Sequence, residues 1–262
     1  MASSNPAFTK SPAFSSGAVV KSAQFGQQSV SASQLDELYS RPSASPVDTD
    51  RMSYEDTIVK TVVAFGILLV GAAVGWIIPV LALPAAIVGF VLALVNIFKK
   101  KPSPALVLSY AAVQGVFVGG ISQFFETAYA GIVFQAILGT LVVVGVTLAL
   151  FASGKVRASK KMTKIFLVAM VGYAVFSLIN FGLLAFGVLD GFGLRSGPLG
   201  VVIGIFVILL AAYSLVLDFD NIKTGVERGA PRIFGWTAAF GIMVTVVWLY
   251  MEILRLLAIF RE

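Results

Sequence analysis

Residues 199–217 read LGVVIGIFVILLAAYSLVL and contain no charged side chain. An α-helix rises 1.5 Å per residue, so about 20 apolar residues cross the roughly 30 Å hydrocarbon core of a bilayer. A transmembrane strand would instead alternate apolar and polar side chains over about ten residues. This stretch is apolar on every side, and it is therefore predicted to form a membrane-spanning helix.

Six further apolar runs of similar length accompany this one, and the charged residues lie mostly outside them. The seven runs are about Ile58–Ile78, Val80–Phe98, Ala105–Phe125, Gly131–Phe151, Ile165–Val188, Leu199–Leu217 and Ile233–Phe260. Only 12% of all residues are charged, whereas a soluble domain carries about 25%. The pattern predicts an all-α polytopic membrane protein, a bundle of seven transmembrane helices in residues 57–262 that contacts the lipid bilayer.

The N-terminal segment, residues 1–56, has a different composition. It is rich in Ser, Ala, Gln and Pro and contains no apolar run long enough for the core of a signal peptide. We expect it to be a disordered tail. At its end, Ser53 precedes the acidic residues Glu55 and Asp56, which is typical of a capped helix start.

The basic residues of the loops predict the orientation in the membrane. The second, fourth and sixth loops contain Lys99, Lys100, Lys101, Lys155, Arg157, Lys160, Lys161, Lys164, Lys223, Arg228 and Arg232. Arg195 is the only basic residue in the odd loops. The positive-inside rule therefore places the even loops and the N-terminus in the cytoplasm. The C-terminus lies outside if the seventh run crosses fully and inside if that run only dips into the membrane.

Composition also bears on the class of activity. The net charge of +6 fits the positive-inside pattern better than nucleic-acid binding. The chain has no cysteine and no histidine, so disulfides, thiolate nucleophiles, Ser–His catalysis and Cys/His zinc sites are excluded. No compact ligand motif is present either, and we expect neither an enzyme nor a bound cofactor.

Small residues recur at a spacing of four in three runs, as Gly71/Gly75, Gly115/Gly119 and Gly200/Gly204. In lipid, close approach of backbones drives helix association, so these pairs are interpreted as packing positions. Asn180, which lies within the fifth run, is interpreted as an interhelical hydrogen-bonding residue.

Ionisable residues inside a span are functional candidates by default. Asp218 and Asp220 end the sixth run, Glu126 closes the third, and Glu252 and Arg255 lie within the seventh. Each has a structural alternative. The three residues at run ends are compatible with a position at the water interface, and Glu252 and Arg255 share a helical face on which they can neutralise each other.

A functional site would require two of these carboxylates to meet. Two carboxylates in one low-dielectric site cannot both ionise cheaply, so such a pair can share a proton and sense pH without histidine. When deprotonated, it would offer oxygen ligands suited to Ca²⁺.

Two segments near the C-terminus resemble the Bax inhibitor-1 family, also called the transmembrane Bax-inhibitor-motif family. Leu217-Asp218-Phe219-Asp220-Asn221-Ile222 is similar to the family's aromatic-Asp-x-Gln-x-Ile at the end of helix six. The run Leu249-Tyr250-Met251-Glu252-Ile253-Leu254-Arg255-Leu256-Leu257 is similar to its Leu-Tyr-Leu-Asp-Phe-Ile-Asn-Leu-Phe in helix seven. The resemblance is expected to cover residues 57–262 and to leave the tail out.

This resemblance implies a bundle with a central last helix and a di-carboxylate site that senses pH and gates a Ca²⁺ leak. By position, Asp218 and Glu252 would be the pH sensor and the Ca²⁺ ligands, with Asp220, Arg255 and Glu126 as auxiliary residues. The chain resembles a divergent, bacterial branch of the family, so a bacterial plasma membrane is expected.

The sequence departs from the family pattern at four points. The second carboxylate is a glutamate, Asp220 replaces a glutamine, and the connection between helices six and seven is longer, with Gly225–Gly235 as the extra material. In addition, the second span has no basic residue before Lys99. A longer connection changes which depths of the two helices face each other.

Two functional hypotheses from different classes follow. The first is a pH-sensitive Ca²⁺-permeable leak channel gated by a membrane carboxylate pair, with Ca²⁺ and protons as its ligands. The second is a non-conducting interaction protein that modulates other membrane proteins, such as a quality-control protease, through its long tail.

Overall fold

The computed structural model of the chain describes residues 50–261, and every regular element in that range is a helix. The long helices are α3 (Tyr54–Ile77), α4 (Ala82–Phe98), α5 (Pro104–Ala128), α6 (Ile132–Ala152), α7 (Lys160–Ala185), α8 (Gly197–Glu227) and α9 (Gly235–Ile259). Three short 3₁₀ helices precede α4, α8 and α9: η1 (Pro79–Leu81), η2 (Gly193–Arg195) and η3 (Arg232–Phe234). Seven helices in the described range are long and apolar enough to cross a membrane, which confirms the predicted bundle.

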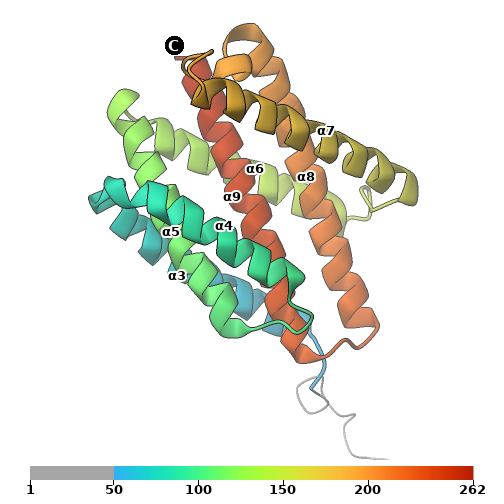
Figure 1. Cartoon of the computed structure of the whole chain (residues 1–262). Coiled ribbons are helices and arrows are strands. Elements are labelled where there is room, and N and C mark those ends of the chain that lie inside the picture. Colours follow the sequence, from blue (N-terminus) through green and yellow to red (C-terminus); the bar gives the residue numbers. More distant parts are fainter. Residues whose placement is uncertain (1–49, 262) are drawn as a thin grey trace, which may run out of the picture. The chain divides into compact units, whose positions relative to one another are not determined.

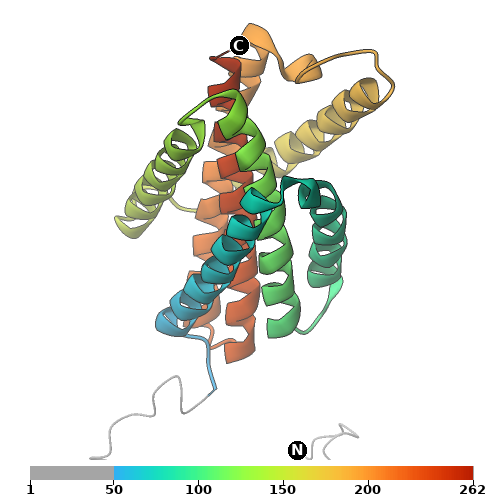
Figure 2. The same ribbon diagram turned by 90° about the vertical axis from the view of Figure 1, so that its left-hand side faces the viewer.

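The last helix is the centre of the bundle. Helix α9 packs against α3, α5, α6 and α8, and Figures 1 and 2 show it surrounded by them. In the apolar stretch of the last span 61% of the residues are buried, whereas in that of α7 only 6% are. Its 25 residues extend over about 37 Å, long enough for a full crossing.

Helices α3 and α5 pack through the predicted glycines. A Cβ atom added to Gly71 would lie 2.3 Å from the carbonyl oxygen of Ala112, and one added to Gly115 would lie 2.1 Å from that of Leu68. Both distances are far below van der Waals contact, so any side chain here would push the helices apart. The interpretation as packing positions is confirmed for the glycines of α3 and α5.

The start of α3 also agrees with the capped helix start predicted at Ser53. Ser53 is the N-cap, and its hydroxyl accepts a hydrogen bond from the backbone N–H of Asp56 at 3.2 Å. The predicted tail therefore overlaps the first helical turn at residues 54–56, while residues 1–49 lie outside the described range.

Helix α8 is longer than the apolar run that predicted it. The run ends at Leu217, whereas α8 continues to Glu227, so Asp218 and Asp220 lie inside the helix and not at its end. Polar side chains at a membrane interface do not interrupt helical hydrogen bonding, so a helix can outlast its apolar stretch. In the predicted extra material, α8 continues to Glu227, η3 covers Arg232–Phe234 and α9 begins at Gly235. Only residues 228–231 of this connection lie outside a helix.

Candidate functional site

Asp218 projects from α8 toward α9. Its carboxylate accepts a hydrogen bond from the hydroxyl of Thr245 at 2.7 Å. A Cβ atom added to Gly241, one turn before Thr245, would lie 3.2 Å from the same carboxylate, so the absence of a side chain there makes room for it. No cation contacts this carboxylate as an ion pair among residues 50–261.

The Asp218 side chain lines a cavity of about 490 Å³. The cavity lies at one end of the bundle, which we call the basic end: the start of α3, the α4–α5 connection and the α8–α9 connection. Asp218, Lys99 and Lys100 are the charged residues that line it, and Asn96 and Asn221 add amide groups. Both lysines are exposed, whereas Asp218 is partly buried. The cavity thus combines an anionic group on α8 with two cationic groups at the end of α4.

Glu252 lies in a different, fully occupied polar cluster. Its carboxylate accepts hydrogen bonds from the guanidinium of Arg255 at 2.5 and 3.1 Å and from the hydroxyl of Tyr173 at 2.5 Å. Arg195 of η2 lies 3.5 Å from the same carboxylate and donates to the Tyr173 hydroxyl at 2.7 Å. The structural alternative, in which Glu252 and Arg255 neutralise each other, describes this geometry.

The structure does not bring Asp218 and Glu252 together. Thr245, the partner of Asp218, precedes Glu252 by two helical turns, about 10 Å along α9. The register of the antiparallel pair explains the separation: Gly241 lies against Asp218, and Leu256 lies against Gly204. A residue of α8 level with Glu252 would therefore lie well before Asp218 in the chain. No shared site for a proton or a Ca²⁺ ion forms between the two predicted residues.

The remaining predicted residues have separate surroundings. Asp220 makes no side-chain hydrogen bond or ion pair with any residue that the structure describes. Glu126 accepts backbone N–H bonds from Gly131 at 2.6 Å and from Val133 at 3.0 Å, so it caps α6. Among residues 50–261 no three acidic side chains converge on one point, so no site with several carboxylate ligands exists there for a tightly held Ca²⁺.

Asn180 links α7 to the short helix η2 and to the residue before it, and not to another membrane span. It accepts a hydrogen bond from the backbone N–H of Leu194 at 2.7 Å and donates to the carbonyl oxygen of Phe192 at 3.3 Å. Its partners are backbone groups of the α7–α8 connection. The connection is thereby held against α7, which helps to place Arg195 beside Glu252.

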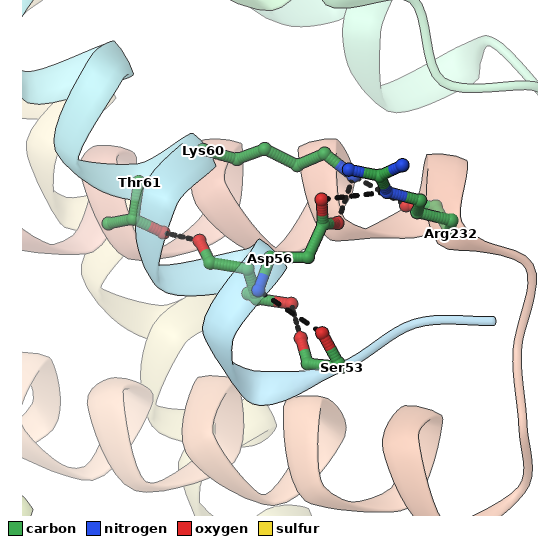
Figure 3. A network of polar contacts seen from close by, with 6 residues as sticks. Ser53, Asp56, Lys60, Thr61 and Arg232 are labelled. Carbon is green, nitrogen blue, oxygen red and sulfur yellow. Dashed lines mark hydrogen bonds and ion pairs between the residues drawn. The ribbon is translucent and has the colours of Figure 1, made fainter. Parts of the chain in front are cut away.

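A second polar cluster at the basic end was missed by the sequence interpretation (Figure 3). Asp56 pairs with Lys60 on the next turn of α3 and accepts a hydrogen bond from the Nε–H of Arg232 at 2.8 Å. Lys60 also donates to the carbonyl oxygen of Arg232 at 2.7 Å and lies 5.8 Å from the centre of the Trp236 ring. We call the three residues Asp56, Lys60 and Arg232 the clamp. The sequence did contain a signal for this cluster, because Lys60 is an ionisable residue inside the first apolar run.

Tyr173 and Arg195 were also not predicted as site residues. Tyr173 lies 79 positions before Glu252 in the chain, and no local pattern indicates such a contact. For Arg195 the only signal was its isolation as the one basic residue of the odd loops.

A comparison with family models gives one match: the model described as Bax inhibitor 1 like matches residues 5–262. The match begins well before the first span, so the expectation that the N-terminal segment lies outside the resemblance was wrong. No curated protein matches the chain.

Proposed function

Because the chain belongs to the Bax inhibitor 1 like family of multi-pass membrane proteins, we propose that it is a pH-sensitive leak pathway for Ca²⁺, with Asp218 as its protonatable group. The observation that carries the proposal is the position of Asp218 on the wall of a cavity, where the described residues give it one neutral hydrogen-bond partner and no ion-paired cation. An unneutralised carboxylate in a membrane-spanning helix is costly, so it is a functional candidate by default.

The direction of the pH effect follows from the charge of this carboxylate. Ionised Asp218 attracts a divalent cation into the cavity, and protonation removes that attraction. We therefore expect Ca²⁺ passage to be faster at pH 8 than at pH 6. The other charged groups that line the cavity are Lys99 and Lys100 of the α4–α5 connection.

The sensor in this proposal is one carboxylate and not the predicted pair. Glu252 is engaged by Arg255, Tyr173 and Arg195, which favours a structural role for it. A single carboxylate offers too few oxygen ligands to hold Ca²⁺ tightly, and weak binding suits an ion that must also leave.

The orientation that accompanies this proposal follows from the basic loops. The positive-inside rule places the basic end, and with it the Asp218 cavity and the N-terminal segment, on the cytoplasmic side of a bacterial plasma membrane. With seven crossings, the C-terminus would lie on the other side.

The alternative is a non-conducting interaction protein. It is favoured by the length of the N-terminal segment, which the family match includes almost entirely. In that case, deletion of residues 2–49 would abolish the capture of other membrane proteins, whereas a conductor would keep its ion flux without these residues.

The test uses purified protein in liposomes loaded with a Ca²⁺ dye. Ca²⁺ entry is measured at about pH 6, 7 and 8 for the wild type, for Asp218→Asn and for Asp220→Asn. The second variant removes the same charge from the same helix, outside the cavity lining. We expect a flat, low profile for Asp218→Asn only. A profile like that of the wild type in Asp218→Asn would overturn the sensor, and an absence of leak at every pH would favour the alternative.

A further inference from the structure

We propose that residues 50–53, which we call the strap, form a movable wall of the Asp218 cavity and control access to it, and that the clamp holds them in the closed position. The proposal rests on the proposed function for its flux readout alone, because access to the cavity can be measured without any ion current.

The strap is joined to the α8–α9 connection by a short antiparallel pairing. The backbone N–H of Met52 donates to the carbonyl oxygen of Ala230 at 2.7 Å, and that of Arg232 donates to Asp50 at 2.9 Å. Arg51 and Pro231 face each other between these two bonds as an isolated bridge. This contact is small, because it consists of two backbone hydrogen bonds. When the strap moves away, hydrogen bonds to water can replace both.

Met52 is the part of the strap that reaches the cavity. Met52 is 4% exposed and lines the same cavity as Asp218. A Cβ atom added to Gly225 of α8 would lie 3.1 Å from the Met52 sulfur, so the side chain fills the space that this glycine leaves open. Ala230, the backbone partner of Met52, lines the cavity as well. Movement of the strap would therefore remove one wall of the cavity.

The clamp fixes the start of α3 to Arg232, whose backbone N–H also binds the strap at Asp50. Asp56 binds Arg232, and Lys60 binds the Arg232 carbonyl oxygen, so both side chains of α3 converge on η3 (Figure 3). The Asp56 and Lys60 side chains are each 10% exposed, whereas that of Arg232 is 45% exposed. The Asp56–Arg232 pair is thus the accessible link of the clamp, and water and salt can weaken it.

The same arrangement couples the cavity to the N-terminal segment. The strap is the first described part of the chain, and the preceding residues continue directly from Asp50. Among the described residues, a displacement of Asp50 acts first on two backbone hydrogen bonds and then on one partly exposed ion pair. We infer that release at the N-terminal side opens the cavity while the packed glycines of α3 and α5 stay in place.

The test of access uses the absence of cysteine from the natural chain. Ala238 is partly buried and lines the cavity, so the full-length variant Ala238→Cys reports access through its reaction with a charged thiol reagent in detergent. Addition of Arg232→Gln breaks the exposed link of the clamp. Loss of such an ion pair changes the ratio of open to closed molecules by up to about fivefold, so labelling should be faster by about the same factor. Arg228→Gln, an exposed arginine outside the clamp, is the matched control. Equal labelling rates in all three proteins would overturn the proposal.

A second experiment compares one variant before and after reduction, so a difference in folding between variants does not affect the result. Arg51 and Pro231 form a non-hydrogen-bonded antiparallel pair, for which Cα atoms lie about 4.5 Å apart, within the range of a disulfide. In the variant Arg51→Cys/Pro231→Cys, oxidation should lock the strap and slow Ca²⁺ entry, and reduction of the same sample should restore it. Equal flux before and after reduction would count against the strap. If no variant conducts, the proposed function fails and the labelling rates alone decide the inference.

Discussion

The Oε2 atom of Glu252 lies 2.5 Å from Nη2 of Arg255, one turn further along the central helix, and the two side chains are 7% and 8% exposed. Arg255 also donates to the carbonyl oxygen of Arg195 at 3.4 Å, so the pair ties the α7–α8 connection to α9. A buried pair of this kind is costly to break, because the remaining partner keeps its charge in a place without water.

Replacement of Arg255 by methionine should therefore destabilise the bundle. Glu252 then retains Arg195 at 3.5 Å and the Tyr173 hydroxyl but loses both hydrogen bonds from Arg255, so the loss should be about 3 kcal/mol. Lys223→Met is the matched control, because the partly exposed Lys223 pairs with the exposed Glu227 across 3.7 Å. Its loss should change stability by less than about 1 kcal/mol. Thermal unfolding in detergent compares the two, and equal midpoints for both variants would contradict a structural role for Glu252 and Arg255.

The glycine contact between α3 and α5 predicts a second loss of stability. Gly115→Val would drive a side chain into the Leu68 carbonyl and separate the helices, since overpacking of a tight contact costs about 1–3 kcal/mol or more. Gly145→Val is the control, because a Cβ atom at Gly145 meets nothing within 4 Å. The yield of monodisperse protein and the unfolding midpoint should fall for the first variant only. A stable Gly115→Val protein would mean that α3 and α5 do not pack as described.

These two contacts mark what could be predicted from the sequence and why. The spans and the glycine packing follow from local patterns, namely apolar length and small residues at a spacing of four. The register of α8 against α9 has no such local signal, because α8 continues through polar residues to Glu227. The register places Asp218 level with Gly241 and Thr245, about two turns of α9 before Glu252, so two residues expected in one site occupy two.

The clamp illustrates a different reason for a missed site. Asp56 and Lys60 are close in the sequence and their spacing indicates a pair on one helical face. Their partner Arg232 lies 176 positions after Asp56, in a connection that looked like a simple basic loop. Only the fold reveals that a helix start and a distant loop form one unit.

The hydrogen bond from Thr245 to Asp218 predicts a shift in the pH profile of the proposed leak. Thr245→Val keeps the shape of the side chain and removes the donor that favours the charged carboxylate. The charged form then requires a higher pH, so the pH of half-maximal Ca²⁺ entry should rise by about one pH unit. Thr237→Val, which lines the cavity without a bond to Asp218, should leave the midpoint in place. A fall of the midpoint in Thr245→Val would contradict the assignment of Asp218 as sensor.

The two lysines at the end of α4 predict an effect of salt on the same flux. Lys99 and Lys100 line the cavity that contains Asp218, so an ion that passes Asp218 also passes their positive charges. Neutralisation by Lys99→Gln/Lys100→Gln should speed Ca²⁺ entry severalfold at about 10 mM ionic strength, where the screening length is about 30 Å. At about 0.5 M salt the gain should largely vanish, because charges are then screened within a few ångströms. Lys160→Gln/Lys161→Gln removes the same charge from the first turn of α7, away from the cavity lining, and should have little effect at either salt concentration. Equal rates for both double variants at low salt would show that ions do not pass the mouth of the Asp218 cavity, and the route of the proposed leak would have to lie elsewhere in the bundle.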